Sequence, residues 1–396
     1  MKISTVNLPR SIYYGKGSLD KIGEVSAQLG RKALIVSDYI MEKLGYLDTC
    51  CSLLKTSGVD FETYLDVASE PLDHYVQEAL ERAKTGNCDV IIGLGGGSCL
   101  DTAKAVAVLA TNPGYIGDYI NLKKLAKNNP LPLIAIPTTA GTGSEATDVT
   151  VITNTGNSVK MMIKQPAFMP EIAIVDPVLT ITSPKQTTAA TGVDALTHAV
   201  EAYISRKAHP FTDQLALSAI KLIMGNLPEA YHNGENMEAR NNMIYASMLA
   251  GIAFSNSSVC LVHGMSRPIG ALFHVPHGIS NAMLLPVVLN YTKDECHNRL
   301  AQIGRYLAPE KTGASDELIS EELVSKIIAL CRELNIPNIK TWGVNETDFS
   351  DKLNKMAKDA LASGSPENNP KIPTEEEIIS LYQESYTFQY PEAKKT

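Results

Sequence analysis

DVIIGLGGGSCLDTAK (89–104) is the stretch that decides the fold, because an apolar strand runs into a turn of small residues and then into a helical pattern. Glycines at such a turn leave backbone N–H groups uncovered, and the helix N-terminus adds a favourable potential for phosphate. The strict G-x-G-x-x-G fingerprint is not met, since a serine takes its last place, and a tight turn without a ligand is the plain alternative. We predict a pyrophosphate-binding turn formed by Gly95, Gly96, Gly97 and Ser98.

Around this turn, the first half of the chain alternates short β-rich runs with helical stretches. ALIVSD (33–38) and FETYLDV (61–67) are interpreted as strands, with a helix near 41–57 between them and another helix beginning at about 73. LPLIAIPTT (131–139) lacks polar alternation, which predicts a parallel strand covered on both faces, near the centre of the sheet. The βαβ pattern indicates an α/β domain with a Rossmann-like parallel sheet.

The pattern of apolar residues changes after AIVDPVLTITSP (173–184). Strand-like runs disappear, and segments such as QLALSAIKLIMGNLPEAY (214–231) show helical spacing of apolar residues. A length of 396 residues fits two domains better than one core. We therefore predict an α/β dinucleotide-binding domain over 1–184 and an all-helical metal-binding domain over 185–396.

Composition excludes several classes of partner and location. Hydrophobic residues make up 44% and charged residues 20%, as in folded globular proteins, and the formal net charge of -8 disfavours nucleic acid or an anionic membrane. We find no export signal and no uninterrupted apolar run of about eighteen residues. The seven cysteines lack C-x-x-C spacing, which is typical of reduced cytosolic thiols. We expect a cytoplasmic protein that acts on small molecules.

A second polar loop follows the predicted central strand. PTTAGTGSE (137–145) offers hydroxyl groups between glycines, at the strand end where open α/β sheets bind ligands. Asp38 ends an earlier strand, where a carboxylate can accept from ribose hydroxyls and would repel a 2′-phosphate, so NAD is favoured over NADP. In the usual Rossmann order the acidic residue follows the glycine turn, whereas Asp38 precedes it, so the topology must differ.

Four residues of the second half predict a metal site. TGVDALTHAVEAY (191–203) places Asp194 and His198 four residues apart on one helix face, and His263 and His277 come later. Three imidazoles and one carboxylate suit a divalent transition metal. Each histidine alone could be structural, but burying Asp194 without a cation or donor would cost several kcal/mol.

With these motifs, the chain resembles the iron-containing, or group III, alcohol dehydrogenase family along essentially its whole length. The resemblance is carried by GGGSCLDTAK (95–104), PTTAGTGSE (137–145), AIVDPVLT (173–180), TGVDALTHAVEAY (191–203) and HGMSRPIGALFHVPHG (263–278). It implies a fold similar to dehydroquinate synthase, with the active site in the cleft between an α/β domain and a helical domain. It also implies that Fe(II), or in some members Zn(II), is held by Asp194, His198, His263 and His277.

The resemblance further implies a set of cofactor contacts. Asp38 would meet the adenosine ribose, and the turn from Gly95 to Ser98 the pyrophosphate. Phe254 would lie near the nicotinamide. Lys160 follows the polar stretch NTGNS and could also be a solvated surface lysine, but the family favours a cofactor role. Other NAD contacts are expected from Asp101, Thr138, Thr139, Thr142, Val151, Lys160 and Leu179.

The chain departs from the family pattern four residues after His263, where many members have another histidine and this sequence has Arg267. Arg267 could form a salt bridge to a nearby carboxylate, or its guanidinium could recognise an anionic group on the substrate. His274 is also unexpected at its position. Our hypothesis is that His274, or a water near the metal, passes the proton to solvent.

These observations predict an NAD(H)-dependent, divalent-metal-dependent alcohol dehydrogenase or aldehyde reductase. Its substrates would be short primary alcohols or diols and their aldehydes, with a short carboxylated, sulfonated or phosphonated aldehyde as the alternative if Arg267 binds anions. A lyase or cyclase of the dehydroquinate-synthase kind and a noncatalytic NAD-binding protein are the rivals from other classes. The resemblance also favours a homo-oligomer, a dimer or larger.

Overall fold

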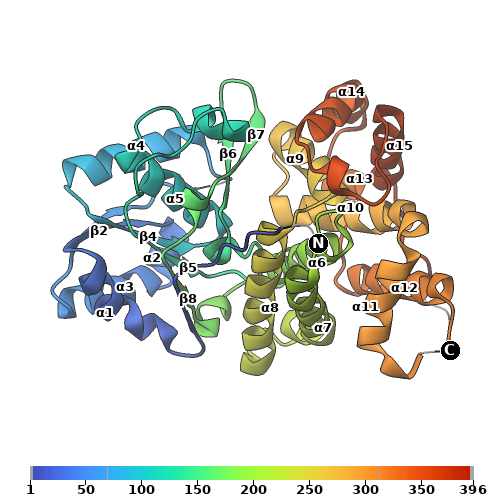
Figure 1. The fold of residues 1–396 in the computed structure, drawn as a ribbon, viewed down its shortest axis with the longest axis horizontal. Helices are drawn as coiled ribbons and strands as arrows, with labels where there is room; N and C mark the ends of the chain where they lie inside the picture. The colour runs from blue at the N-terminus through green and yellow to red at the C-terminus, as the bar shows by residue number, and fades with distance from the viewer. Residues whose placement is uncertain (1–2, 69, 312, 393–396) are drawn as a thin grey trace.

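The structure, a computed structural model, describes residues 3–68, 70–311 and 313–392, and a sheet-containing half lies beside a helical half (Figure 1). The first half contains a six-stranded sheet in the order β1-β8-β5-β4-β2-β3, in which all paired strands are parallel. Its strands are β1 (Ser11–Tyr14), β2 (Lys32–Val36), β3 (Asp60–Tyr64), β4 (Val90–Gly95), β5 (Leu133–Pro137) and β8 (Ile172–Val175).

Helices cover both faces of this sheet, as the apolar character of its strands requires. One face of the sheet packs against α4 and α5, and the opposite face packs against α1 and α3. The predicted central strand is confirmed, because β5 lies between β8 and β4 in the interior of the sheet. The helices of this half are α1 (Ile22–Leu29), α2 (Tyr39–Lys43), α3 (Tyr46–Thr56), α4 (Asp73–Thr85) and α5 (Gly97–Thr111).

Two features of the α/β half differ from the sequence prediction. The single helix expected near 41–57 is wrong, because the chain forms α2 and α3 with a break at Gly45, whose φ of 77° is left-handed. An antiparallel hairpin of β6 (Val149–Asn154) and β7 (Val159–Lys164) was not predicted. In Figure 1 this hairpin stands at the edge of the α/β half that faces the helical half.

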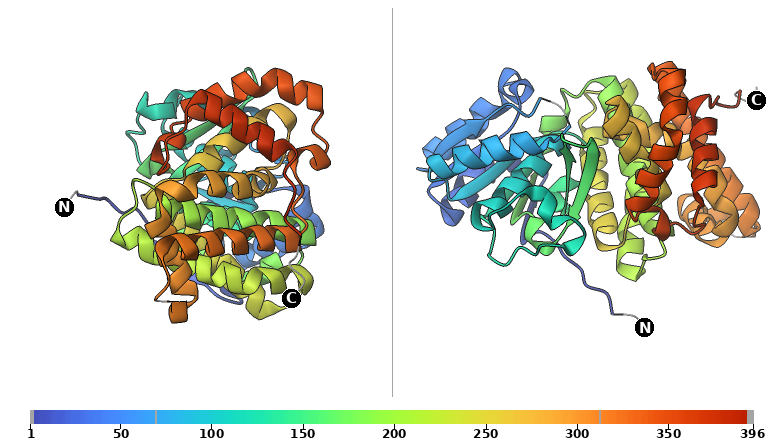
Figure 2. Two further views of the ribbon diagram at one scale, coloured as in Figure 1. Left: turned by 90° about the vertical axis from the view of Figure 1, so that its right-hand side faces the viewer. Right: turned by 90° about the horizontal axis from the view of Figure 1, so that it is seen from above.

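The second half is helical in its described residues, as predicted. After β8 the chain makes a short 3-10 turn, and α6 begins at Lys185, so we propose the domain boundary at 184/185. Figure 2 shows that α14 and α15 lie on the side of this half away from the sheet. Its α-helices are α6 (Lys185–Ile204), α7 (Pro210–His232), α8 (Met237–Asn256), α9 (Leu261–Phe273), α10 (His277–Thr292), α11 (His297–Leu307), α12 (Asp316–Glu333), α13 (Ile339–Trp342), α14 (Glu346–Ala362) and α15 (Glu375–Tyr386).

One large apolar core holds these helices together, and it includes buried side chains from α6 through α15. Among the described helices, none is by itself long and apolar enough to cross a bilayer. Only α8 and α9 taken together pass such a test, and the chain bends by 102° between them.

Candidate metal centre and cofactor cleft

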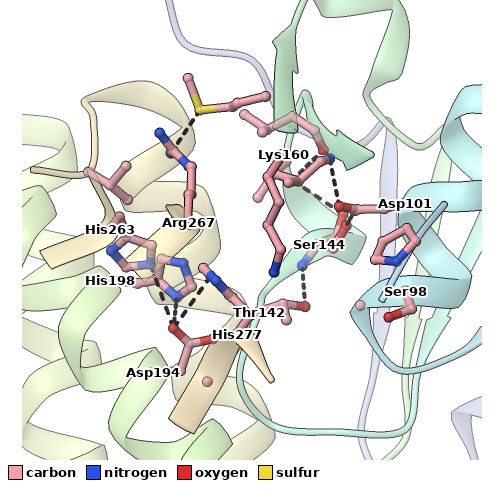
Figure 3. A pocket seen from close by; sticks show the side chains of 18 of the residues that line it. Ser98, Asp101, Thr142, Ser144, Lys160, Asp194, His198, His263, Arg267 and His277 are labelled. Atoms are coloured by element: carbon pink, nitrogen blue, oxygen red, sulfur yellow. Dashed lines mark hydrogen bonds and ion pairs between the residues drawn. The ribbon is translucent and has the colours of Figure 1, made fainter. Parts of the chain in front are cut away.

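Three helices of the second half bring the four predicted metal ligands together. Asp194 and His198 lie one turn apart on α6, His263 lies in the first turn of α9, and His277 is the first residue of α10. One donor atom from each of these residues lies within 4.8 Å of the others. Figure 3 shows the three imidazoles converging on the Asp194 carboxylate, whose Oδ1 lies 3.6 Å from His263 Nε2 and 3.9 Å from both His198 Nδ1 and His277 Nε2.

The electrostatics of this cluster favour ligands in their metal-binding forms. Burial lowers the pKa of His198 to about 3 and that of His277 to about 4, so both imidazoles are neutral at pH 7 and keep a lone pair. Burial opposes ionisation of Asp194, but the surrounding imidazoles outweigh it and hold the pKa of that carboxyl well below its usual range. A carboxylate with neutral imidazoles is the donor set that divalent transition metals prefer.

Glu201, one turn after His198 on α6, orients the third imidazole. Its Oε2 accepts a hydrogen bond from His263 Nδ1 at 2.6 Å and from Cys260 N at 2.9 Å, and its Oε1 accepts from Val262 N at 2.6 Å. Burial lowers the pKa of His263, but the Glu201 carboxylate more than offsets this, so the pKa is raised. With the proton on Nδ1, the other ring nitrogen of His263 faces the cluster as an acceptor.

The buried polar atoms at the cluster also fit a cation. His198 Nδ1 is buried and has no hydrogen-bond partner in the described structure. The amide nitrogen of Asn281 lies 2.6 Å from Asp194 Oδ1 and 3.1 Å from the Nε2 atoms of His263 and His277, so the ligand atoms share one small polar space. Four donors arranged in this way suit one divalent metal ion.

A cavity of about 280 Å³ extends from this cluster to two segments of the α/β half. These are the glycine turn (95–98) and the polar loop 137–145, called here the hydroxyl loop. Most of the cofactor residues predicted from the sequence line it together: Gly96, Gly97, Ser98, Asp101, Thr139, Thr142, Val151, Lys160 and Phe254. Phe254 stacks on His198, with ring centroids 4.3 Å apart, and so forms an apolar wall beside the cluster. Asp38, Gly95, Thr138 and Leu179 are not among the lining residues.

The glycine turn needs glycine at its first position. Gly95 ends β4 with a φ of 148°, and a Cβ there would lie 2.6 Å from Cys99 Sγ. Asp38 stands nearby as the N-cap of α2, where it accepts from Ile40 N and Met41 N, and Cys99 Sγ lies 3.4 Å from its other oxygen. The carboxylate predicted to meet ribose is therefore adjacent to the turn predicted to meet phosphate.

Asp101 and Leu179 have structural roles that the sequence did not reveal. The Asp101 carboxylate accepts from Ser144 Oγ at 2.6 Å and from Val151 N at 2.8 Å, so it ties α5 to the hydroxyl loop and to β6. Leu179 is 3% exposed and packs in the core between the sheet and α1 and α3. Asp101 also lines the cavity itself, whereas Leu179 shapes the cleft through the residues that it packs against.

Lys160 is a buried cation in the cleft, not a solvated surface lysine. Its Nζ lies 2.9 Å from Glu70 Oε2, and its side chain is 3% exposed. The other oxygen of Glu70 accepts from the backbone N of His277 at 3.0 Å. Glu70 therefore joins a lysine of the α/β half to a histidine of the metal cluster.

Arg267 and His274 occupy different environments. Arg267 is 6% exposed and lines the cavity, but no carboxylate lies within salt-bridge distance of it in the described part of the chain, so the salt bridge, one of the two alternatives, is not found there. His274 is exposed at the end of α9 with a left-handed φ of 55°, and it is not among the residues that line the cavity. The structure therefore brings Arg267 to the site but does not bring His274.

Sequence reasoning missed Glu201, Asn281 and Glu70. Signals existed for the first two, because Glu201 follows His198 by three residues and Asn281 follows His277 by four, which keeps each on the cluster face of its helix. Glu70 reaches His277 across 207 positions of sequence, and no local pattern predicts such a contact.

Comparisons relate the chain to known proteins. A family model described as "Iron-containing alcohol dehydrogenase" matches residues 9–177, and one described as "Fe-containing alcohol dehydrogenase family, C-terminal" matches residues 188–386. The chain is 38% identical to 1,3-propanediol dehydrogenase of Citrobacter freundii, with 96% of this chain and 98% of that protein covered. It is 36% identical to NAD-dependent methanol dehydrogenase of Bacillus methanolicus, with 94% and 97% covered. A crystal structure of 1,3-propanediol oxidoreductase matches with a TM-score of 0.92 at 37% identity, over 97% of this chain and all of that one (100%).

Proposed function

Because this chain belongs to the iron-containing alcohol dehydrogenase family, we propose that it interconverts short primary alcohols or diols and their aldehydes, using NAD(H) and one divalent metal ion. It is an oxidoreductase that acts on small molecules, with the dehydroquinate synthase-like fold predicted from its sequence. Fe(II) is the first candidate for the metal and Zn(II) the second.

One observation carries this proposal: a carboxylate and three imidazoles face one another at the end of a cavity that begins at a glycine turn. When bound there, the divalent metal would polarise a carbonyl or hydroxyl oxygen, and the nicotinamide of NAD(H) would carry the hydride. The residues of the cluster and the cavity would hold these two groups. Glu201 holds His263 in one tautomer, and Phe254 presents a flat apolar surface that keeps water from one side of the cluster.

The cofactor would lie along the cavity between the two halves. The N-terminus of α5, with Gly96 at its N-cap, offers backbone N–H groups to the pyrophosphate. Asp38 would accept from the adenosine ribose hydroxyls at the adjacent strand end. The nicotinamide end would then reach Phe254 and the cluster, with Lys160 beside it. We keep the remaining predicted contacts, Thr138, Thr139, Thr142 and Val151, as part of this proposal.

An assay of NADH consumption tests the proposed function. The purified chain is stripped of metal with a chelator, reloaded with Fe(II) under anaerobic conditions or with Zn(II), and mixed with NADH and a series of short aldehydes. We expect net NADH oxidation in the reloaded protein and its loss after stripping. Turnover that survives complete chelation would overturn the metal role. Product formation without any net change in NADH would instead support a lyase or cyclase.

Two further parts of the proposal have separate tests. All seven cysteines are free thiols, which supports a reducing compartment such as the cytoplasm, and fractionation of the native cells checks this. We propose a homo-oligomer, a dimer or larger, and light scattering after size exclusion measures its mass.

A further inference from the structure

Three lysine or arginine side chains of the described residues line the main cavity, and two of these three have an acidic side chain of the described residues within 4.0 Å. Lys160 is paired with Glu70 at 2.9 Å, and Lys164 Nζ lies 3.8 Å from an oxygen of Asp148. Arg267 has no acidic side chain within 4.0 Å among the described residues. Among the described residues, the cavity therefore presents one guanidinium that forms no salt bridge.

We propose that Arg267 is the anchor of an anion-binding subsite, so that the preferred substrate is a short aldehyde with a carboxylate, sulfonate or phosphonate at its far end. This inference rests on the proposed function and narrows its substrate class. The anionic group would accept hydrogen bonds from the Arg267 fork while the carbonyl lies at the Asp194 cluster.

The surroundings of Arg267 leave its hydrogen-bonding capacity largely unused. A guanidinium has five N–H donors, and here it donates to Ser365 Oγ at 2.9 Å and to the Met162 sulfur at 3.1 Å. Both acceptors are uncharged, and a thioether is a weak one. Burial lowers the pKa of Arg267 to about 10, so it remains charged at neutral pH. The Glu201 carboxylate partly opposes this effect of burial, but it makes no hydrogen bond to Arg267. A buried cation whose hydrogen bonds go only to neutral groups has an energetic cost that an anionic ligand would offset.

The position of Arg267 sets where the anion would lie. His263 and Arg267 are four residues apart on α9, so they share one face of the helix and differ by about one turn, or roughly 5.4 Å of rise. In Figure 3 the Arg267 side chain extends away from the Asp194 carboxylate, toward the hairpin of the α/β half. The guanidinium thus lies about one helical turn from the cluster, at the wall where α9 meets the hairpin and away from the glycine turn, which fits a short substrate with the anion and the carbonyl at opposite ends.

A second cavity meets the first at this residue. It has a volume of about 140 Å³, and Lys160, Met162 and Arg267 line both cavities. Asp359 is the one acidic side chain that lines the second cavity in the described structure, and it is paired with Lys355 at 2.6 Å. The second cavity therefore leaves room beside the guanidinium for an anionic group, and the one carboxylate among its described lining residues is already paired.

A matched pair of aldehydes tests the subsite in the metal-loaded enzyme. KM and kcat are measured with 4-oxobutanoate and with butanal, which share a four-carbon chain, in the wild type, Arg267→Met and Arg267→Lys. We expect the wild type to have the lower KM for 4-oxobutanoate. Arg267→Met should raise that KM by about tenfold or more, the size of a lost charged hydrogen bond, and should change the butanal KM little. Arg267→Lys keeps the positive charge but lacks the paired N–H donors of a guanidinium. Its KM for 4-oxobutanoate should therefore lie between those of the wild type and Arg267→Met.

Controls separate charge, folding and function. Arg10→Met removes an exposed positive charge that pairs with Glu171 far from the cavity, and it should leave the ratio of the two KM values unchanged. If Arg267→Met fails to fold, Arg267→Lys provides the test. A ratio of the 4-oxobutanoate KM to the butanal KM equal to that of the wild type would refute the subsite. The corresponding sulfonate and phosphonate aldehydes then show which anion is preferred.

A binding measurement distinguishes failure of the subsite from failure of the proposed function. Calorimetry of the metal-free protein with NAD+ compares 4-hydroxybutanoate with butane-1,4-diol. Tighter binding of 4-hydroxybutanoate that is lost in Arg267→Met supports the subsite even if no aldehyde consumes NADH. Equal binding of the two, or equal loss of both in the variant, overturns it, even if neutral aldehydes are good substrates.

Discussion

Replacing Glu201 by glutamine should weaken both the fold and the metal centre, although the two side chains have nearly the same shape. Each carboxylate oxygen of Glu201 accepts only from N–H donors, namely His263 Nδ1, Cys260 N and Val262 N. An amide has one acceptor oxygen and one NH₂ donor, so in either orientation its NH₂ would face at least one of these N–H groups. If the NH₂ faces His263 Nδ1, that imidazole must move its proton to the nitrogen that faces Asp194.

The size of the effect follows from these contacts. A hydrogen bond to a charged group contributes about 1.5–3 kcal/mol, and an unsatisfied buried N–H costs about 1–3 kcal/mol. Glu201 is 1% exposed, so solvent cannot replace the lost partner. The unfolding free energy should therefore fall by about 3–5 kcal/mol. Loss of a carboxylate that orients a ligating histidine typically lowers metal affinity by about 10–100-fold.

Chelator competition measures the metal dissociation constant, and urea denaturation of the metal-free protein measures the unfolding free energy. Glu333→Gln is the matched control, because Glu333 also bonds to a histidine, His232, at 3.1 Å, but on the surface with both side chains about half exposed. That change should cost at most about 1 kcal/mol and leave metal affinity unchanged. Metal affinity of Glu201→Gln within twofold of the wild type would refute the orienting role.

Three other changes have direct outcomes. Asp194→Asn removes the only carboxylate of the cluster, so elemental analysis should find little bound metal and aldehyde reduction should fall at least about a hundredfold. Gly95→Ala forces an L side chain to a φ of 148° and a Cβ to within 2.6 Å of Cys99 Sγ, so stability should fall by about 1–3 kcal/mol and the KM for NAD+ should rise; an unchanged melting temperature would contradict this strain. Burial raises the pKa of Glu145 to about 7 from 4.5, so the folded state keeps a proton that the unfolded state has released between these values. The unfolding free energy should therefore fall by about 3 kcal/mol as pH rises through this interval, and Glu145→Gln should remove that part of the slope in pH-dependent denaturation.

Much of the α/β half could be predicted because its strands carry a strong local signal. The run LPLIAIPTT is apolar without alternation, and the structure buries β5 inside the sheet, where both faces are covered. The hairpin of β6 and β7 was not predicted, although VTVITN and the following NTGNS form a strand and turn pattern, because the second strand, VKMMIK (159–164), lacks regular alternation of polar and apolar residues. The break at Gly45 depends on one left-handed residue, and helical periodicity alone does not reveal it.

The metal ligands could be predicted for a similar reason. Asp194 and His198 lie one turn apart on one helix, so their spacing in the sequence already implies a shared face. The partners of Arg267 could not be inferred in this way. Whether a buried guanidinium meets a carboxylate depends on which distant segments pack beside it, and here these are Ser365 and Met162, about a hundred residues away in either direction. Thus the sequence left open a choice that the packing decides.

The two halves of the site are linked through one carboxylate. The metal cluster belongs entirely to the helical half, whereas the glycine turn, Lys160 and Glu70 belong to the other half. Glu70 accepts from the backbone of His277 at the N-terminus of α10, where a negative charge also complements the helix dipole, and it pairs with Lys160 through its second oxygen. A cofactor that draws Lys160 away from Glu70 would therefore alter the charge beside a histidine of the cluster. Arg267 also lines the cavity, and no carboxylate of the described residues forms a salt bridge with it. Lys160 is already paired within the protein, and this difference is the basis for the proposal that Arg267 selects the charge of the substrate.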